Sequence, residues 1–86
     1  MKDRPPHLLY EAMQIVLSTR TGEEATSTEI SDEIDRRKLY WKQDGGKASA
    51  RQVSARANNK RNHFKRTLDG KIRLIGGVKL LPKGKP

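Results

Sequence analysis

Apolar side chains recur at helical spacing near the start of the chain. The stretch HLLYEAMQIVLSTR follows Pro5 and Pro6 and contains apolar residues three and four positions apart. Residues with this spacing lie on one face of an α-helix, and proline is well tolerated in a helix's first turn. The pattern predicts a first helix over residues 6–19, followed by a polar connector over residues 21–25.

A second helical pattern begins after Thr26. The Thr26 hydroxyl is placed to cap the helix, and Glu29 is placed to reach back to the Thr26 backbone in a capping box. Ile30, Ile34 and Leu39 supply the apolar stripe that we expect to be buried. Acidic residues precede basic ones along this segment, which is the order that the helix dipole favours. We interpret these charges as a solvated helix face and expect no metal site.

A third helix is predicted over residues 49–60, with Ser49 as N-cap and Gln52 at the reciprocal position of a capping box. Steps of 100° per residue place Ala50, Val53 and Ala57 on one side, which we expect to face the core. Ser54 and Arg56 flank the opposite side. That opposite side consists of Arg51, Gln52, Ala55, Asn58 and Asn59.

The segment HFKRTLDGKIRLI predicts a β-hairpin over residues 64–75 that turns at Asp69-Gly70. A two-residue loop would mix polar and apolar side chains on each face. A three-residue loop over residues 68–70 separates them, so we predict this register, with Gly70 in the left-handed conformation of a bulged turn. It pairs Phe64 with Leu74 and Arg66 with Ile72 on one face, and Lys65 with Arg73 and Thr67 with Lys71 on the other.

Three helices followed by a two-stranded hairpin predict an α+β fold, mainly α, with the outline of a winged helix-turn-helix. A chain of 86 residues makes one domain with a small core, since a domain of this size buries only about 60–65% of its unfolded surface. We assign residues 1–75 to the domain and residues 76–86 to a flexible basic tail or linker. Tyr40 and Trp41 are expected to pack against the core.

Charge is distributed unevenly along the chain. Residues 1–41 carry six Lys/Arg and eight Asp/Glu, which gives a net charge of −2. Residues 42–86 carry thirteen Lys/Arg and two Asp/Glu, which gives +11, and the two parts sum to the net charge of +9. The third helix and the hairpin therefore form a basic region, which suits a polyanion because neutralised phosphates release counterions. A basic surface that only aids solubility is the alternative explanation.

Double-stranded DNA is the polyanion that this arrangement favours, with the third helix in the major groove and the hairpin as the wing. Arginine recognises guanine, asparagine and glutamine recognise adenine, and an alanine methyl contacts thymine. We predict base contacts from Arg51, Gln52, Ala55, Asn58 and Asn59. Phosphate contacts are predicted from Lys47, Ser54, Arg56, Lys60, Arg61, Lys65, Thr67, Lys71 and Arg73.

The segments EISDEIDRRKLY, GGKASARQVSAR and HFKRTLDGKIRLI together resemble the HARE-HTH winged-helix domain over about residues 7–75. Lys38 stands where this family commonly has glycine, and Ala48-Ser49 stand where it commonly has Thr-Pro. The resemblance implies DNA binding by a targeting module of a restriction-type, transcription-associated or chromatin-associated protein, with a catalytic or regulatory domain beyond the C-terminus. The matching positions are Glu29-Ile30, Ile34, Leu39, Gly46-Lys47, Val53, Phe64, Ile72 and Leu74.

Other functions are weaker predictions. Asp69 to Lys71 is the only local motif that resembles a nuclease site, and the hairpin turn explains it. His7 and His63 are expected to lack an acidic partner. We therefore predict no catalysis and no cofactor. A protein-docking module, with an apolar patch around Tyr40, Trp41, Leu80 and Leu81, is the main alternative. Double-stranded RNA is a further alternative. The absence of cysteine and of any apolar span predicts an intracellular protein, in the cytoplasm with the nucleoid or in the nucleus, without membrane contact.

Overall fold

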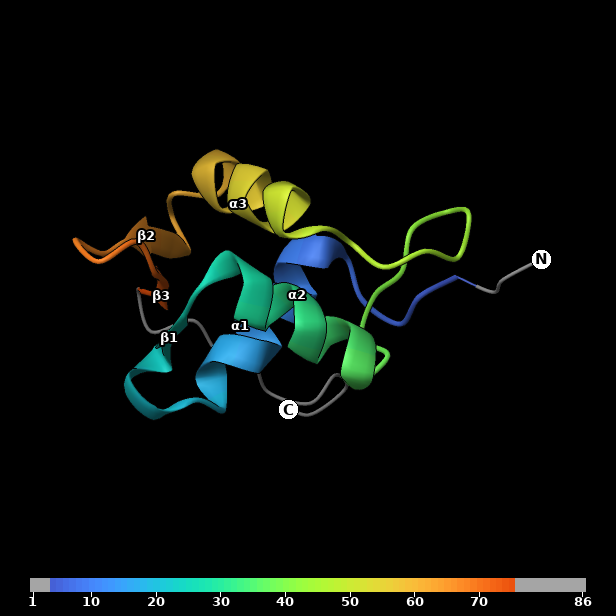
Figure 1. Cartoon of the computed structure of the whole chain (residues 1–86), viewed down its shortest axis with the longest axis horizontal. Helices are drawn as coiled ribbons and strands as arrows, with labels where there is room; N and C mark the ends of the chain where they lie inside the picture. The colour runs from blue at the N-terminus through green and yellow to red at the C-terminus, as the bar shows by residue number, and fades with distance from the viewer. Residues whose placement is uncertain (1–3, 76–86) are drawn as a thin grey trace, which may run out of the picture.

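The computed structural model describes residues 4–75 and has three helices with a three-stranded antiparallel sheet (Figure 1). The predicted α+β class, mainly helical, is confirmed. The predicted tail over residues 76–86 lies outside the described residues, as do Leu80 and Leu81. In chain order the elements are α1 (Leu9–Ser18), the 3-10 turn η1 (Thr21–Glu23), β1 (Glu24–Ala25), α2 (Ser27–Arg36), α3 (Ala50–Asn59), β2 (Phe64–Arg66) and β3 (Ile72–Leu74).

Both predicted capping boxes are present. The Glu29 backbone N–H donates to Thr26 Oγ1 at 3.1 Å, and the Thr26 N–H donates to Glu29 Oε1 at 3.0 Å. Ser49 and Gln52 make the same reciprocal pair at the start of α3, at 3.1 and 3.0 Å. These bonds satisfy backbone donors that a helix start leaves without partners, which fixes where α2 and α3 begin.

Helix α1 begins three residues later than predicted. Leu8 has extended backbone angles, and its N–H donates to Glu11 Oε1 at 2.9 Å. Glu11 thereby takes the capping role, so Pro5 and Pro6 precede the helix instead of forming its first turn. Helix boundaries are the feature that a sequence pattern defines least well.

Helix α2 ends in a Schellman motif centred on Lys38. The Leu39 N–H donates to the Ile34 carbonyl at 3.0 Å, and the Lys38 N–H donates to the Asp35 carbonyl at 3.1 Å. Lys38 has φ +57°, in the left-handed region that glycine adopts without strain. The motif turns Leu39 back against the core.

The sheet has one strand more than predicted. Its order is β1-β3-β2, because Glu24 and Ala25 of the polar connector pair with Arg73 and Ile72 of β3. A two-residue strand is too short to show the alternation that identifies strands in a sequence, and its partner lies far along the chain. The prediction of a two-stranded hairpin alone is therefore not confirmed, and β1 closes the outer edge of β3.

The predicted hairpin register is confirmed. Phe64 pairs with Leu74, and Arg66 pairs with Ile72. Thr67 N–H donates to the Lys71 carbonyl at 2.9 Å, which closes the three-residue loop over residues 68–70. Gly70 has φ +85°, as the bulged turn requires. Segregation of apolar from cationic side chains is therefore sufficient to select the register in this hairpin.

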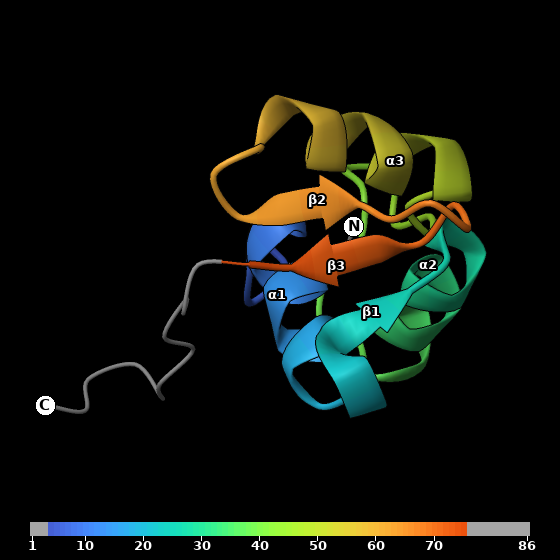
Figure 2. The ribbon, with the colours of Figure 1, turned by 90° about the vertical axis from the view of Figure 1, so that its left-hand side faces the viewer.

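The core lies between the three helices and the inner face of the sheet. Figure 2 shows β2 next to α3, with β3 in the middle and β1 on the far side. Val53 and Ala57 of α3 are buried, and Ser31 of α2 donates to the Ala48 carbonyl at 2.6 Å, which anchors the segment that leads into α3. Tyr40 packs against the core as predicted, and Trp41 is half-buried. The buried apolar side chains are Leu9, Ala12, Met13, Val16, Leu17, Ala25, Ile30, Ile34, Ala48, Val53, Ala57, Phe64, Ile72 and Leu74.

The connection between α2 and α3 spans residues 37–49, which is far longer than the turn of about 3–4 residues in a compact helix-turn-helix. The hairpin extends beyond the helices at one end of the molecule (Figure 1). Within residues 4–75, no helix is long and apolar enough to cross a membrane.

Candidate nucleic-acid interface

Helix α3 presents a polar face to solvent. The five predicted base-contacting residues are all exposed, and the predicted inward residues Val53 and Ala57 are buried, while Ala50 is half-buried. Of the two flanking residues, Ser54 is half-buried and Arg56 is exposed. The helical periodicity therefore identified the exposed face correctly. Whether these side chains contact bases stays a prediction.

Arg66 connects the hairpin to α3. It pairs with the buried Ile72 on the inner face of the sheet, but its long side chain leaves the core and is exposed. Its guanidinium donates to Ser54 Oγ, to the Ser54 carbonyl at 3.4 Å and to Asn58 Oδ1 at 3.4 Å. This cation of the hairpin thus lies beside the polar face of α3.

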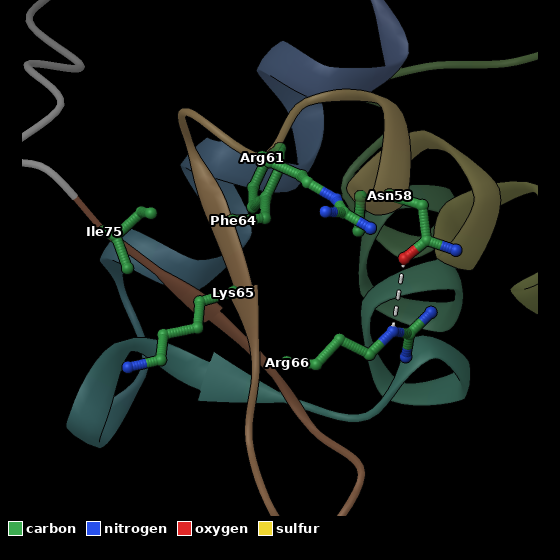
Figure 3. A pocket seen from close by; sticks show the side chains of 7 residues that line it. Asn58, Arg61, Phe64, Lys65, Arg66 and Ile75 are labelled. Atoms are coloured by element: carbon green, nitrogen blue, oxygen red, sulfur yellow. Dashed lines mark hydrogen bonds between the residues drawn. The ribbon is translucent and has the colours of Figure 1, made fainter.

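A groove of about 350 Å³ separates the end of α3 from β2. Its inner wall includes the apolar residues Ala57 and Phe64, and Figure 3 shows Arg61 and Arg66 directed from opposite sides toward Asn58. Lys65 and Ile75 complete the lining. The groove therefore combines an apolar wall with cationic and amide groups at its opening.

One group of cations has no acidic partner among residues 4–75. Its members lie on α3, on the connection after it and on β2, and we call them the α3–β2 basic surface. Because no carboxylate neutralises them in the described part of the chain, they are available to an anionic ligand. They are Arg51, Arg56, Lys60, Arg61, Lys65 and Arg66.

Three cations predicted to contact phosphate have acidic partners within the described chain, and their contact with phosphate stays a prediction. Lys47 Nζ lies 2.5 Å from Asp32 Oδ1, and this hydrogen bond raises the pKa of Lys47. On the outer face of the sheet, Glu24 lies 3.8 Å from Arg73 and 3.9 Å from Lys71. Strand β1 brings this carboxylate from the acidic half of the sequence to the hairpin, so a charge count by sequence segment overestimates the positive charge there.

The two hydroxyl groups in the predicted phosphate set have structural partners. Ser54 Oγ accepts from Arg66. Thr67 Oγ1 donates to the Asp69 carboxylate and accepts from the Lys71 backbone N–H at 3.0 Å. The bond from Thr67 lowers the pKa of Asp69. Thr67 therefore shapes the hairpin loop, and its hydroxyl has both a donor and an acceptor role within the chain.

The connection between α3 and β2 is held against α1 by ring contacts. His63 stacks on Tyr10 with ring centroids 5.6 Å apart, and Lys60 Nζ lies 4.5 Å from the Tyr10 ring centroid. These contacts fix the base of the hairpin relative to the helices. His7, which precedes α1, lies 4.0 Å from Glu11 in the first turn of that helix, so the expectation that it lacks an acidic partner was wrong.

Two residues that shape this interface were not among the predicted site residues. Arg66 was assigned to the inner face of the hairpin, although its length allows it to reach α3. Glu24 was treated as part of a polar connector, and nothing in its local sequence indicates pairing with β3. Within the described part of the chain, no three His, Cys, Asp or Glu side chains are grouped so that they could hold a metal ion.

Comparison of this chain with protein-family models, with curated proteins and with solved structures finds no match.

Proposed function

We propose that this protein is a winged-helix module that binds double-stranded DNA, with α3 in the major groove and the β2–β3 hairpin as the wing. The observation that carries the proposal is the position of the α3–β2 basic surface. Arg51 and Arg56 are exposed on α3, and Arg66 reaches α3 through its bonds to Ser54 and Asn58. Glu33 and Asp32 of α2 and Glu24 of β1 pair with cations outside this surface. A duplex lying along α3 would therefore meet positive charge without a competing carboxylate.

The side-chain types on α3 support base recognition. Arg51 can donate two hydrogen bonds to guanine, and an amide such as Asn59 can accept from N6 and donate to N7 of adenine in the major groove. Both side chains are exposed, and α3 makes no backbone kink that would turn them apart. Arg56 lies beside this face and Lys65 is exposed on β2, and both suit phosphate oxygens, which position the protein without selecting a sequence.

The fold supports the winged-helix assignment through its connectivity. The helix after the long α2–α3 connection is capped at Ser49, and it is followed directly by a hairpin whose loop extends beyond the helices. Membership of the HARE-HTH family, and a role as the targeting part of a larger restriction-type or chromatin-associated protein, are proposals that rest on the sequence resemblance.

Duplex binding measured at several salt concentrations tests the proposal. If about four to six phosphates are neutralised, the logarithm of affinity falls with the logarithm of salt concentration at a slope of about −4 to −5, and random duplex binds with a Kd of about 10⁻⁴ to 10⁻⁶ M at physiological salt. Absence of duplex binding at low salt would reject DNA as the ligand and favour the alternative of a protein-docking module. Stronger binding to double-stranded RNA of equal length would redirect the proposal to RNA.

A further inference from the structure

The groove between α3 and β2 has features that a fully paired duplex does not use. Its volume of about 350 Å³ lies at the lower end of the range of about 300–1,000 Å³ for pockets that hold small ligands. Its apolar lining comes from half-buried Ile75 and from the small exposed parts of Ala57 and Phe64, which are each 3% exposed, and Arg61 and Arg66 stand at its opening. A suitable occupant therefore combines a compact, flat and weakly polar body with a negative charge.

A nucleotide has this combination. Bases freed from stacking pack on arginine guanidinium planes, and their phosphates pair with cations. Arg61 and Arg66 have no acidic partner among residues 4–75 and point toward the same end of the groove (Figure 3). The groove therefore offers the guanidinium of Arg61 and that of Arg66, which also donates to Ser54 and Asn58, at a site where no carboxylate of the described chain competes.

Asn58 lies at the opening and is oriented by Arg66. Its Oδ1 accepts from Arg66 Nε at 3.4 Å, which leaves the two Nδ2 hydrogens without a partner among the described side chains. An amide held in this way donates to ring nitrogens or carbonyl oxygens on the edge of a base. Asn58 therefore supplies a polar contact that an apolar peptide side chain would not satisfy.

We infer that this groove binds one unpaired nucleotide of DNA, an extrahelical base next to the duplex that α3 contacts. The base lies against the apolar wall with Asn58 at its edge, and the cations hold its phosphate. A base inside a duplex is stacked on both faces and cannot enter, so the groove distinguishes duplexes with an unpaired base from fully paired ones. This inference rests on the proposed DNA binding and names the class of DNA that the site prefers.

Three duplexes of equal length test the inference with the full chain. One is fully paired, one carries a single extra adenine, and one carries an abasic residue at the same bulge. We expect the adenine bulge to bind about five- to tenfold more tightly than the paired duplex, from stacking of one base. The abasic bulge is as flexible but has no base, so it should lose this preference. Equal affinity for the adenine and abasic bulges would overturn the inference.

Two matched variants locate the effect. Arg61→Ala removes a guanidinium that lines the groove, and Arg56→Ala removes an exposed guanidinium of α3 that does not line it. Arg61→Ala should reduce the preference for the adenine bulge to near one. Arg56→Ala should weaken all three duplexes in equal proportion and keep the preference. Equal effects of the two variants on the preference would place the base outside the groove.

The controls separate this inference from the proposed function. Salt-dependent binding to paired duplex without any bulge preference would overturn the inference and leave the proposed function intact. Failure of every duplex to bind at low salt would overturn both. Circular dichroism and thermal melting of both variants check that each is folded, which we expect because both side chains are exposed.

Discussion

Glu24 lies directly opposite Arg73 in the sheet, with Glu24 Oε1 3.8 Å from Arg73 Nη1. The same carboxylate lies 3.9 Å from Lys71 Nζ, so one residue of β1 neutralises part of the hairpin. DNA that contacts the wing must compete with this carboxylate for both cations, and its phosphates are repelled by it. If the protein binds DNA as proposed, Glu24 therefore weakens binding at the hairpin.

We expect Glu24→Gln to increase affinity for duplex DNA. Exposed ion pairs are worth about 0.2–1 kcal/mol each, so release of two cations should tighten binding about three- to tenfold at low salt and make the salt slope steeper by about one. Fluorescence anisotropy titrations measure both quantities. Glu23→Gln is the control, because it makes the same charge change at an exposed residue without an ion pair in residues 4–75. Equal gains from both variants would indicate a net-charge effect only.

Lys65 and Lys71 should differ in their contribution to DNA binding. Lys65 belongs to the α3–β2 basic surface, whereas Lys71 lies near both Glu24 and Asp69. Lys65→Ala should weaken binding to all sequences about fivefold and reduce the salt slope by about one, and Lys71→Ala should also act equally on all sequences but with a smaller loss. In a Glu24→Gln background the loss from Lys71→Ala should grow. Equal losses for the two lysines in the parent protein would contradict the role assigned to Glu24.

Base recognition by α3 is tested with Arg51→Ala. A guanidinium that contacts a guanine should cost about 1–3 kcal/mol on a preferred site when it is removed, with a smaller loss on random duplex. Selection of bound duplexes from a random pool identifies the preferred site, and competition titrations measure the ratio of affinities. A loss of the same size on preferred and random DNA would show that Arg51 contacts only phosphate.

Lys38→Gly should stabilise the fold. Lys38 is exposed and has φ +57°, a conformation that strains a residue with a Cβ atom. Relief of this strain exceeds the entropy that glycine adds to the unfolded chain, so we expect a gain of about 0.5–1 kcal/mol in the free energy of unfolding. Urea denaturation measures it. Lys38→Ala removes the same charge but keeps the strain, and a gain of equal size in that variant would show that charge, not backbone conformation, is responsible.

Glu33 should contribute stability that depends on pH. Hydrogen bonds from Arg36 and then Arg37 lower the pKa of Glu33 from 4.5 to about 2, and Arg37 also donates to Thr19 Oγ1 at 2.9 Å, which ties α2 to α1. A depressed folded-state pKa gives stability that is present above pH 4.5 and is lost as pH falls toward 2.

Comparison of Glu33→Gln with the parent protein measures this contribution. At pH 7 the variant should be less stable by about 0.5–1 kcal/mol, the range for a pair at the surface. The difference should shrink from pH 4.5 downward and vanish near pH 2, where the carboxyl group of the parent is protonated. A difference that stays constant over this range would mean that the charge of Glu33 is not what stabilises α2.

The sequence predicts the local features of this protein because their causes are local. A capping box needs two side chains three residues apart, and the hairpin register depends on which residues alternate over a few positions, so Thr26, Ser49 and Gly70 were placed correctly. The exposed face of α3 follows from helical periodicity in the same way.

Only the tertiary structure decided the charge of the interface. Glu24 reaches the hairpin through pairing of β1 with β3, and Arg66 reaches Asn58 across the gap between β2 and α3. Electrostatic interactions act through space and depend on distances between groups that are far apart in the chain. The sequence therefore determined the elements and the faces they expose, and the packing of those elements determined which cations have acidic partners in the described chain and which remain available to a ligand.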